Sequence, residues 1–451
     1  YNGTTDSSKI LAKVVLSNWL IKILFANIIK RYFNDAKRIE QIKHTTTIQE
    51  AIAIFESISQ NCDFWNIFST QLAQECLTTK SWDELVQINL LLNEVDLGSV
   101  DTNILQNLLQ SSIIKSDRRI AGQFATPQKL GELLVQMTIG DLAGKVLDPC
   151  CGTGTIIKEV FKLKAKHQIS EDDILDSTWA SDKYAFPLQL ATLSLSTPSN
   201  FKKIVKIFKS DVIDLQVDKN ISFIDPSDGS NITMELPEFE YIVSNLPFVQ
   251  QEDLKVLNPN IKSINDWISQ ETQSGINLTG KSDLFVYIPF YLFQLINKGG
   301  KIGLILSNAW LGADYGRNFV AVLQKFFHIE TVIVSGNGKW FKNANVVASI
   351  LILQKKDTDE SVKSINFCVL NDKIEEVNDP SEIAADIHYR KTTNALSVTT
   401  YTSNEIDSIH RIGLPWTSLF ADIKWINAII PNLTLASEFF HIGRGERRGW
   451  D

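Results

Sequence analysis

The stretch KVLDPCCGTG, residues 145–154, decides the fold of this chain. Its first residues, 145–147, form a short apolar run of the kind that builds a buried strand. Asp148 follows, and then Gly152 and Gly154, which let the backbone turn tightly without a Cβ in the way. A segment with helical spacing begins at Ile156. A strand, a glycine turn and a helix in this order predict an α/β unit with a ligand-binding turn at the carboxyl end of the strand.

The same alternation of short apolar runs and helical segments continues along the chain. The expected strands are 145–147, 178–181, 205–208, 241–244, 301–306, 331–334 and 349–354. The expected helices are 128–139, 156–165, 187–194, 285–296 and 316–326. Short buried strands that alternate with helices predict a doubly wound α/β fold, with a mostly parallel sheet that helices cover on both faces.

The remaining segments have a different character. Residues 7–115 carry apolar side chains at spacings of three and four, which predicts an all-α domain. Residues 218–240 are polar and rich in turn pairs, so we expect a surface insertion or hairpin there. The expected domains are a helical domain over 1–118, the α/β domain over 119–392, and a linker leading into a further region over 393–451.

The composition is that of an ordinary globular protein. Of the 451 residues, 44 are Lys or Arg and 52 are Asp or Glu, so the formal net charge is −8. This charge argues against strong nonspecific binding to nucleic acid, although local DNA contacts stay compatible with it. The five cysteines form no CxxC pair, so we expect a reduced, cytoplasmic compartment. Because the chain begins with Tyr1, we expect it to be part of a longer protein.

The most apolar stretch of the chain is not expected to cross a membrane. Residues 10–29 contain Lys13, Asn18, Lys22 and Asn27. Charged side chains inside a bilayer cost several kcal/mol. We therefore expect a helix packed inside the protein.

The turn after the first strand is a candidate cofactor loop. It does not match GxGxxG, so the pyrophosphate of a dinucleotide is disfavoured as its ligand. An acid at a strand end followed by bare glycines suits a ligand with a cationic amino-acid part and a nucleoside part, and S-adenosylmethionine is such a ligand. The structural alternative is an ordinary tight turn between strand and helix.

Two further acids follow the next two strands. Asp182 comes after the second strand and could accept hydrogen bonds from ribose hydroxyls, as an acid does in dinucleotide-binding folds. Asp176 is a rival for this role, and helix capping is the structural alternative. Asp211 ends the third strand and could accept from an adenine amino group, although an Asp at such a place often caps a helix.

The fourth strand, 241–244, runs into Asn245-Leu246-Pro247-Phe248. A buried Asn at a strand end needs hydrogen-bond partners, and Pro fixes the next turn. The Asn245 Oδ1 atom and the Leu246 carbonyl could accept the two hydrogens of a planar exocyclic amine while Phe248 stacks on its ring. The structural alternative is an Asn-x-Pro turn with a core Phe. The position after the fourth strand of a sheet that already has a candidate cofactor loop favours the amine-binding interpretation.

Residues 122–127, 148–154 and 245–248 together resemble the amino-group DNA methyltransferases. Among these they are similar to the N6-adenine enzymes of type I modification subunits and of single-chain type II restriction–modification proteins. The resemblance covers about residues 97–451. It implies S-adenosylmethionine as cofactor, double-stranded DNA as substrate, a specificity or nuclease subunit or domain as a further partner, and no metal.

The resemblance also implies a role for each matching residue. The segment that covers the methionine end of the cofactor matches Phe124, Thr126 and Pro127. The cofactor loop matches Asp148, Cys150, Gly152 and Gly154. The ribose acid matches Asp182, and the acid near the cofactor adenine matches Asp211. The catalytic unit (N/D)-P-P-(Y/F/W) matches Asn245, Leu246, Pro247 and Phe248. Motifs that flank the target-base pocket match residues 281–285 and 306–311, and the start of a target-recognition domain matches 443–450.

Leu246 departs from the catalytic pattern, which usually has a second Pro there. The position contributes mainly its carbonyl, which Leu also has, so the catalytic interpretation stands. The cost would be a looser loop, because Pro restricts the unfolded chain and Leu does not.

The resemblance implies transfer of a methyl group from S-adenosylmethionine to N6 of a flipped adenine in a specific DNA sequence, within a restriction–modification system. A protein or RNA amine methyltransferase is one alternative, because an Asn-x-Pro-aromatic unit can also hold a glutamine amide or a guanine amine. A catalytically inactive, methylase-like DNA-binding subunit is another. N4-cytosine methylation would suit the same acceptors.

Overall fold

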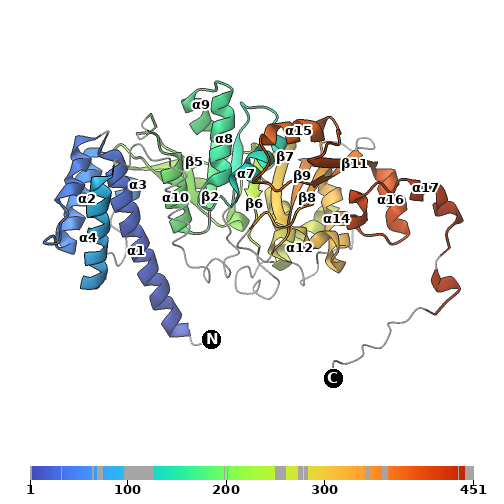
Figure 1. Cartoon of the computed structure of the whole chain (residues 1–451), viewed down its shortest axis with the longest axis horizontal. Helices are drawn as coiled ribbons and strands as arrows, with labels where there is room; N and C mark the ends of the chain where they lie inside the picture. The colour runs from blue at the N-terminus through green and yellow to red at the C-terminus, as the bar shows by residue number, and fades with distance from the viewer. Residues whose placement is uncertain are drawn as a thin grey trace.

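The computed structural model describes residues 3–31, 33–62, 65–68, 75–95, 126–197, 199–200, 202–248, 261–272, 278, 283–341, 346–357, 364–434 and 436–441. In these ranges a large sheet flanked by helices lies between a group of N-terminal helices and a set of short C-terminal helices (Figure 1). No described helix is both long and apolar enough to cross a bilayer.

Within the described residues, nine strands form one sheet in the order β11-β10-β8-β9-β7-β6-β1-β2-β3. Their bounds are β1 (Val146–Asp148), β2 (Thr178–Asp182), β3 (Lys206–Lys209), β6 (Phe239–Asn245), β7 (Ile296–Ser307), β8 (Phe327–Ser335), β9 (Ala348–Lys355), β10 (Ser364–Leu370) and β11 (Leu396–Thr402). Strand β1 pairs in parallel with β2 and β6, and the β2–β3, β6–β7 and β8–β10 pairs are parallel too. Strand β9 runs antiparallel to β7 and β8, and β11 runs antiparallel to β10. The predicted doubly wound, mostly parallel sheet is confirmed.

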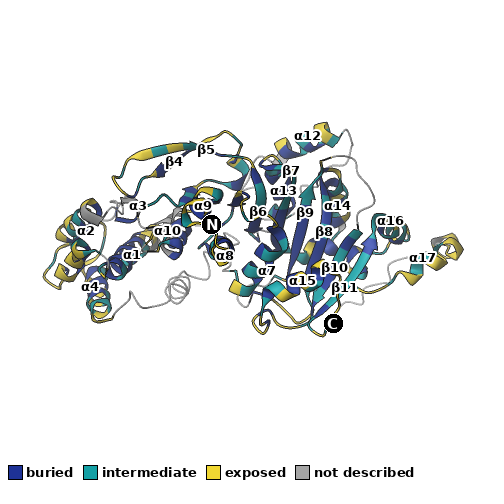
Figure 2. Ribbon diagram, turned by 90° about the horizontal axis from the view of Figure 1, so that it is seen from above, coloured by how far each residue is buried: buried dark blue, intermediate teal, exposed yellow. Residues whose placement is uncertain are grey.

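Helices cover both faces of this sheet, as the strand sequences require. Neighbouring residues on a strand point to opposite faces. Leu147 and Ile242 belong to one apolar cluster, whereas Val146 and Val243 belong to another. The first cluster takes side chains from α12 (Ile261–Thr272), α13 (Ile288–Leu292) and α14 (Asp314–Phe326). The second takes them from α7 (Gln128–Thr138), α8 (Thr155–Lys166), α10 (Ala185–Leu195) and α15 (Pro380–His388). The sheet is therefore buried on both sides (Figure 2).

The N-terminal helices form their own apolar cluster. They are α1 (Gly3–Ile29), η1 (Asn34–Gln41), α2 (Ile48–Cys62), α3 (Trp65–Phe68) and α4 (Thr79–Glu94). The ring of Trp19 meets Phe55 and Trp82 edge to face, at centroid distances of 5.7 and 5.0 Å. Leu190 of α10 belongs to the same cluster, so the helices dock on the α/β domain. The expected helical region and the packed helix over 10–29 are confirmed, while the boundary near 118 lies outside the described residues.

Two segments depart from the strand–helix rhythm. Strands β4 (Asn220–Ile224) and β5 (Asn231–Glu235) form the expected antiparallel hairpin. The single helix expected over 285–296 is instead η5 (Leu284–Val286), α13 and the start of β7; Pro289, which has no N–H, lies in the first turn of α13 and separates that helix from η5. Next to these elements, Lys206 of β3 is buried and donates to the Asp176 carboxylate at 2.9 Å.

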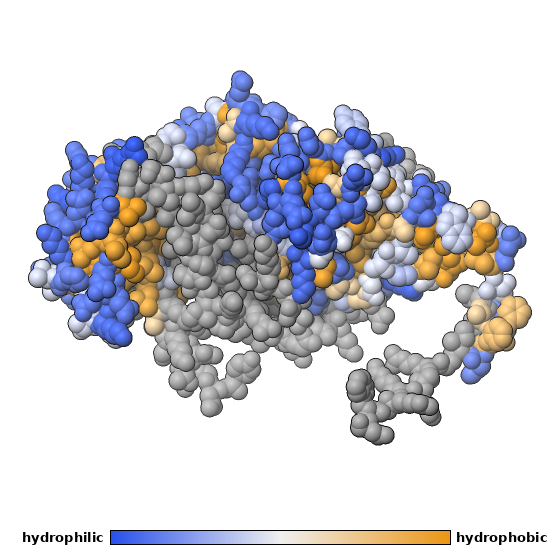
Figure 3. All heavy atoms as spheres, in the orientation of Figure 1, coloured by the Kyte–Doolittle hydropathy of each residue, from blue (hydrophilic) through white to orange (hydrophobic). Residues whose placement is uncertain are grey.

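The sheet and its packing extend past residue 392, where the α/β domain was expected to end. Strand β11 pairs with β10 along its length, and α16 (Ser403–Arg411) follows. Beyond α16 lie η7 (Trp416–Phe420), α17 (Trp425–Ile429), η8 (Ile430–Asn432) and η9 (Ala436–Glu438). Apolar surface is visible over these last helices and over the N-terminal ones (Figure 3). Trp425, Phe439 and Phe440 are 62%, 72% and 69% exposed.

Candidate active site

Four of the predicted site residues lie at the carboxyl edge of the parallel strands. Asp148 ends β1, Asp182 ends β2 and Asn245 ends β6, while Asp211 follows β3 by two positions. The parallel register puts Asp148 opposite Ala180 and Asp182 opposite Lys209. These strands are neighbours in the sheet, so the four side chains come from adjacent positions along one edge.

The glycine turn after β1 needs both of its glycines, for different reasons. Gly152 and Gly154 have φ angles of +53° and +86°, in the left-handed region that favours glycine. A Cβ on Gly154 would lie 3.0 Å from the Ala191 backbone of α10, so this glycine allows close packing. A Cβ on Gly152 would meet no heavy atom within 4 Å. The turn is therefore packed on one side and open on the other.

Asp182 holds the glycine turn to the end of β2. Its Oδ2 atom accepts from the Gly152 N–H at 3.0 Å, and its Oδ1 atom accepts from the Tyr184 N–H at 2.9 Å. Burial raises the pKa of this carboxyl. The rival Asp176 lies in α9 (Glu171–Ser177), before β2, and pairs there with Lys206. Of the two acids, Asp182 alone stands at the carboxyl edge, and its role toward a ribose stays a prediction.

Asp148 connects the glycine turn to β6. Its Oδ1 atom accepts from the Ser244 hydroxyl at 2.7 Å and from the Cys150 N–H at 3.2 Å. The side chain is 1% exposed, and burial raises its pKa to about 7. The sequence analysis did not identify Ser244. The pattern that could have indicated it is a small hydroxyl residue directly before Asn245, after the apolar residues of the strand.

Asp211 makes two contacts that the sequence left open. It caps η3 (Val212–Asp214) by accepting from the Ile213 N–H at 3.4 Å, and its Oδ2 atom lies 2.8 Å from Lys183 Nζ. Capping, the structural alternative, is thus one of its contacts. Sequence reasoning did not identify Lys183, which directly follows Asp182. The role of Asp211 toward an adenine stays a prediction.

Cys150 lies among these acids. Its pKa is raised well above the usual value, first by burial and then by the negative charges of Asp182, Asp148 and Asp211. A thiol in this setting stays protonated, and only the thiolate is strongly nucleophilic. Cys150 is therefore suited to a structural role in the loop and not to that of a nucleophile.

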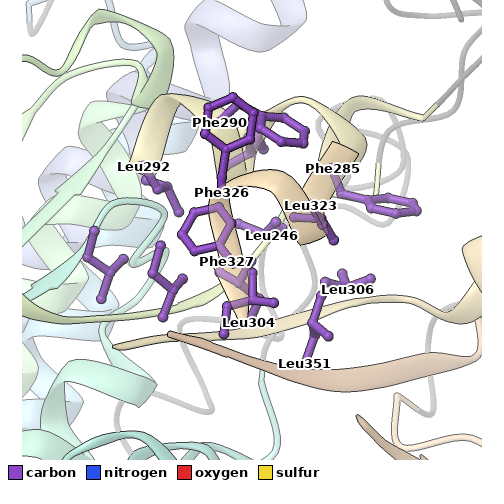
Figure 4. Packing of buried hydrophobic residues seen from close by; sticks show 14 of the residues in the cluster. Leu246, Phe285, Phe290, Leu292, Leu304, Leu306, Leu323, Phe326, Phe327 and Leu351 are labelled. Carbon is purple, nitrogen blue, oxygen red and sulfur yellow. The ribbon is translucent and has the colours of Figure 1, made fainter. Parts of the chain in front are cut away.

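The Asn245-Leu246-Pro247-Phe248 turn passes between the two apolar clusters. Leu246 is buried among Leu304, Leu306 and their neighbours on one side of the sheet (Figure 4). Phe248 is 8% exposed and belongs to the cluster on the other side. Its ring meets Phe341 edge to face at 5.4 Å. The structure thus packs Phe248 against a second aromatic ring that sequence reasoning missed, and stacking of Phe248 on a base stays a prediction.

The Asn245 side chain is tied to a segment far away in sequence. Its Nδ2 atom donates to Thr126 Oγ1 at 3.0 Å, across 119 positions of the chain. Pro127 follows Thr126 and occupies the N-cap position of α7, without a side-chain capping bond. The structure therefore brings two of the residues expected to cover the methionine end of a cofactor next to the expected catalytic unit.

Comparison with known proteins identifies the family. Residues 96–404 match the family model described as N-6 DNA Methylase. The chain belongs to the N-6 DNA methylase family. It is 22% identical over 294 residues to the type II methyltransferase M.BanIII of Aneurinibacillus aneurinilyticus, a match that covers 62% of this chain and 46% of the relative. The predicted resemblance to the methylases of restriction–modification systems is confirmed.

Solved structures share the fold of this methylase. The type IIG restriction endonuclease BpuSI aligns with a TM-score of 0.58 at 14% identity, over 92% of this chain and 46% of that protein. The type I restriction–modification methyltransferase subunit of Streptococcus thermophilus aligns with a TM-score of 0.58 at 13% identity, over 90% of this chain and 93% of that one. The methylase thus spans about half the length of M.BanIII and of BpuSI.

Several expected positions of the methylase lie outside the described residues. These are residues 122–125 with Phe124 among them, residues 281–282 of one later motif, and residues 443–450 with their three arginines. In the other later motif, Ser307 caps η6 (Asn308–Leu311) and Trp310 is buried. Among the residues that the structure describes, His, Cys, Asp and Glu form no group that could hold a metal ion.

One further pattern in the methylase has the wrong context for its usual function. Residues 275–282, GINLTGKS, match the GxxxxGK[ST] pattern of phosphate-binding loops. That motif requires a strand before the loop and a helix after it. In the described residues the helix α12 precedes it and the short turn η5 follows. Apart from Leu278, residues 275–282 lie outside the described ranges, and the described neighbours of the pattern are not the strand and helix that a phosphate-binding loop requires.

Proposed function

We propose that this protein transfers a methyl group from S-adenosylmethionine to N6 of an adenine flipped out of a specific double-stranded DNA sequence, within a restriction–modification system. The observation that carries the proposal is the junction of β1 and β6. Ser244 donates to Asp148 at 2.7 Å, so Asn245 follows directly on a residue that contacts the start of the glycine turn. A methyl donor on the turn and an amine held by Asn245 would lie side by side.

The residues around the glycine turn suit S-adenosylmethionine. A Cβ on Gly152 would meet nothing within 4 Å, so the backbone there leaves room for a ligand. Asp148, Asp182 and Asp211 offer carboxylates at one edge, and these can accept from the ammonium, ribose hydroxyls and adenine amine of the cofactor. When bound, the cofactor supplies an electrophilic methyl group on a sulfonium ion.

The residues of the catalytic turn would act on the target amine. The lone pair of adenine N6 is delocalised into the ring, which makes it a poor nucleophile. If Asn245 Oδ1 and the Leu246 carbonyl accept its two hydrogens, the lone pair becomes localised and positive charge growing on N6 is stabilised. Orienting the reacting groups can lower a barrier by roughly 7–11 kcal/mol. Flipping the base costs a few kcal/mol, which stacking on Phe248 would partly offset.

Target recognition would come from additional protein. The methylase spans 46% of M.BanIII and 46% of BpuSI. We propose that a recognition region following this chain, or a specificity subunit, supplies the sequence-specific DNA contacts. Arg444, Arg447 and Arg448 are candidates for phosphate or base-edge contacts.

The test is a methyl-transfer assay with radiolabelled S-adenosylmethionine on unmodified double-stranded DNA, on RNA and on cell-extract protein. We expect label in DNA alone, recovered as N6-methyladenine after digestion to nucleosides. Asn245→Ala should lower the rate by about 100-fold or more, because it removes a preorganised acceptor. It should leave S-adenosylmethionine binding intact.

Three outcomes would contradict the proposal in different ways. Label in RNA or protein would favour the other amine methyltransferases. Recovery of N4-methylcytosine would show that the target base is cytosine and not adenine. A noncatalytic subunit would be favoured if the wild-type protein did not bind the cofactor and Asn245→Ala left DNA binding unchanged.

A further inference from the structure

An ion pair joins the ends of two neighbouring strands beside the glycine turn. Lys183 directly follows the last residue of β2, and Asp211 comes two positions after β3. The Lys183 Nζ atom lies 2.8 Å from Asp211 Oδ2. Next to this pair, the Ser210 N–H donates to the Asp182 carbonyl at 3.1 Å. The two charged side chains are therefore carried by backbone segments that are hydrogen-bonded to each other.

The two oxygens of the Asp211 carboxylate have contacts of unequal strength. The Oδ2 atom has the charged partner Lys183, whereas Oδ1 accepts from the Ile213 N–H at 3.4 Å, which is long for a hydrogen bond. A carboxylate has about four lone-pair sites, so these two contacts leave it able to accept from a ligand. The side chain is 20% exposed, so a ligand can reach it. Lys183 is thus the stronger of two contacts that orient an accessible acceptor.

The direction of this carboxylate matters for the cofactor contact proposed above. The hydrogens of an adenine 6-amino group lie in the plane of the ring, so an acceptor has to lie close to that plane. An aspartate side chain turns about two bonds, and the negative charge of Asp182 acts on that of Asp211. A charge-assisted contact with an ammonium opposes this repulsion and holds one oxygen in place. Without Lys183, the carboxylate would be free to turn away from the amine.

We propose that Lys183 is a positioning residue that directs the Asp211 carboxylate to the 6-amino group of the cofactor adenine. This inference rests on the proposed use of S-adenosylmethionine and adds a residue that the family resemblance does not supply. Two other roles for Lys183 make different predictions. A direct contact with the cofactor would not need the 6-amino group, because an ammonium can only donate and the lone pair of that amine is delocalised. A brace between β2 and β3 would affect all ligands alike.

The first experiment measures how tightly the full-length protein binds S-adenosylhomocysteine, which is the cofactor without its methyl group, by calorimetric titration. Lys183→Met removes the charge and keeps a long unbranched side chain, whereas Lys183→Arg keeps a charged donor. We expect the Kd to rise about fivefold or more in Lys183→Met, because a misdirected carboxylate loses part of a charge-assisted hydrogen bond. Lys183→Arg should recover most of the affinity.

Lys209→Met is the matched control for this experiment. Lys209 is the exposed last residue of β3, two positions before Asp211, so its replacement removes the same charge from the same edge of the sheet. Between these two described lysines, it is Lys183 that pairs with Asp211. Lys209→Met should therefore change the Kd by less than about twofold. The Tm should be nearly the same in both variants, because exposed ion pairs contribute little to stability.

The second experiment repeats the titrations with an analogue of S-adenosylhomocysteine whose purine carries hydrogen in place of the 6-amino group. The wild-type protein should bind this analogue more weakly, because Asp211 then has no amine to accept from. Lys183→Met should weaken binding of the analogue by less than about twofold, since the direction of the carboxylate no longer matters. A lysine that contacts the ribose or a ring nitrogen, or that acts only on the fold, would weaken the binding of both ligands by the same factor.

The outcomes separate this inference from the function on which it rests. A wild-type protein that methylates no DNA overturns the proposed methyl transfer, whatever its affinity for the two ligands. A wild-type protein that binds S-adenosylhomocysteine, with Lys183→Met equal to it in Kd, overturns the positioning role alone. Equal wild-type affinity for the two ligands, or equal weakening of both by Lys183→Met, overturns that role as well.

Discussion

Gly152 and Gly154 lie two positions apart in one turn and should respond differently to the same substitution. Gly154→Ala places a Cβ 3.0 Å from the Ala191 backbone at a φ of +86°. We expect it to lower the free energy of unfolding by about 2–4 kcal/mol. A Cβ at Gly152 would meet no atom within 4 Å. Gly152→Ala should therefore lower the free energy of unfolding only through its left-handed backbone, by about 1–2 kcal/mol. Its methyl group, however, enters the proposed cofactor space.

Thermal unfolding and titration with S-adenosylmethionine check this pair of variants. Gly154→Ala should show the larger fall in Tm, whereas Gly152→Ala should stay folded and bind the cofactor far more weakly. Wild-type cofactor affinity in a folded Gly152→Ala variant would argue against the open side of the turn as the binding surface.

At this scale, the functional residues at strand ends could be predicted from sequence. The residues that contact them from other elements of the fold could not. Asp148, Asp182 and Asn245 were found because a polar residue directly after an apolar run marks the carboxyl end of a strand. Ser244, directly before Asn245 on β6, contacts Asp148 at the end of β1, and Phe341 packs on Phe248 from a segment far along the chain. Such contacts depend on strand register and on packing between layers, which one sequence does not display.

At the scale of elements, α7 packs on β7 at Gly303, which has no side chain. A Cβ on Gly303 would collide with Thr138 Oγ1 and lie 3.1 Å from Leu134 Cδ1, both on α7. Gly303→Ala should therefore push the helix off the sheet and lower the free energy of unfolding by about 1–3 kcal/mol. Because Thr126 leads into α7, methyl transfer should fall as well.

Gly312→Ala is the matched control for this prediction. A Cβ there would lie 4.0 Å from Thr417 Cγ2 and meet nothing closer, so the substitution should change stability by less than about 0.5 kcal/mol. Urea denaturation of both variants measures the difference. Equal stability of Gly303→Ala and Gly312→Ala would show that α7 is not seated through this glycine.

Inner strands buried on both faces were predictable from sequence, and the edge strand β11 was not. Strand β9, residues 241–243 of β6 and residues 302–306 of β7 are near-continuous apolar runs because each face of the sheet is covered. Strand β11, with the sequence LSVTTYT, lies at the sheet edge and buries only Leu396 and Tyr401 fully. With so few buried positions, the strand shows almost no alternation of apolar and polar residues. Its sequence therefore cannot be distinguished from that of a loop.

At the scale of the whole molecule, Leu190 joins the N-terminal helices to the α/β domain. It sits on α10, yet its buried side chain belongs to the cluster of α1, α2 and α4. Leu190→Ala should cost about 2–5 kcal/mol and uncouple the two regions. Hydrogen exchange should then rise in peptides from α1–α4 before it rises in the strands of the sheet.

Leu85→Ala provides the comparison for this whole-molecule prediction. Leu85 is 2% exposed on α4, inside the N-terminal cluster, and does not lie on α10. This variant should lower the stability of the helices by a similar amount without separating them from the sheet. Identical exchange patterns in the two variants would mean that Leu190 has no special part in docking.

The bond between Thr126 and Asn245 has a consequence for any incomplete form of the protein. It links positions 119 residues apart, one before the first strand of the sheet and the other at the end of β6. A nascent or proteolysed chain that lacks either partner therefore lacks this contact between the start of α7 and the end of β6. Under the proposed function, incomplete products of this kind should not methylate DNA, and methylation should begin only after β6 has joined the sheet.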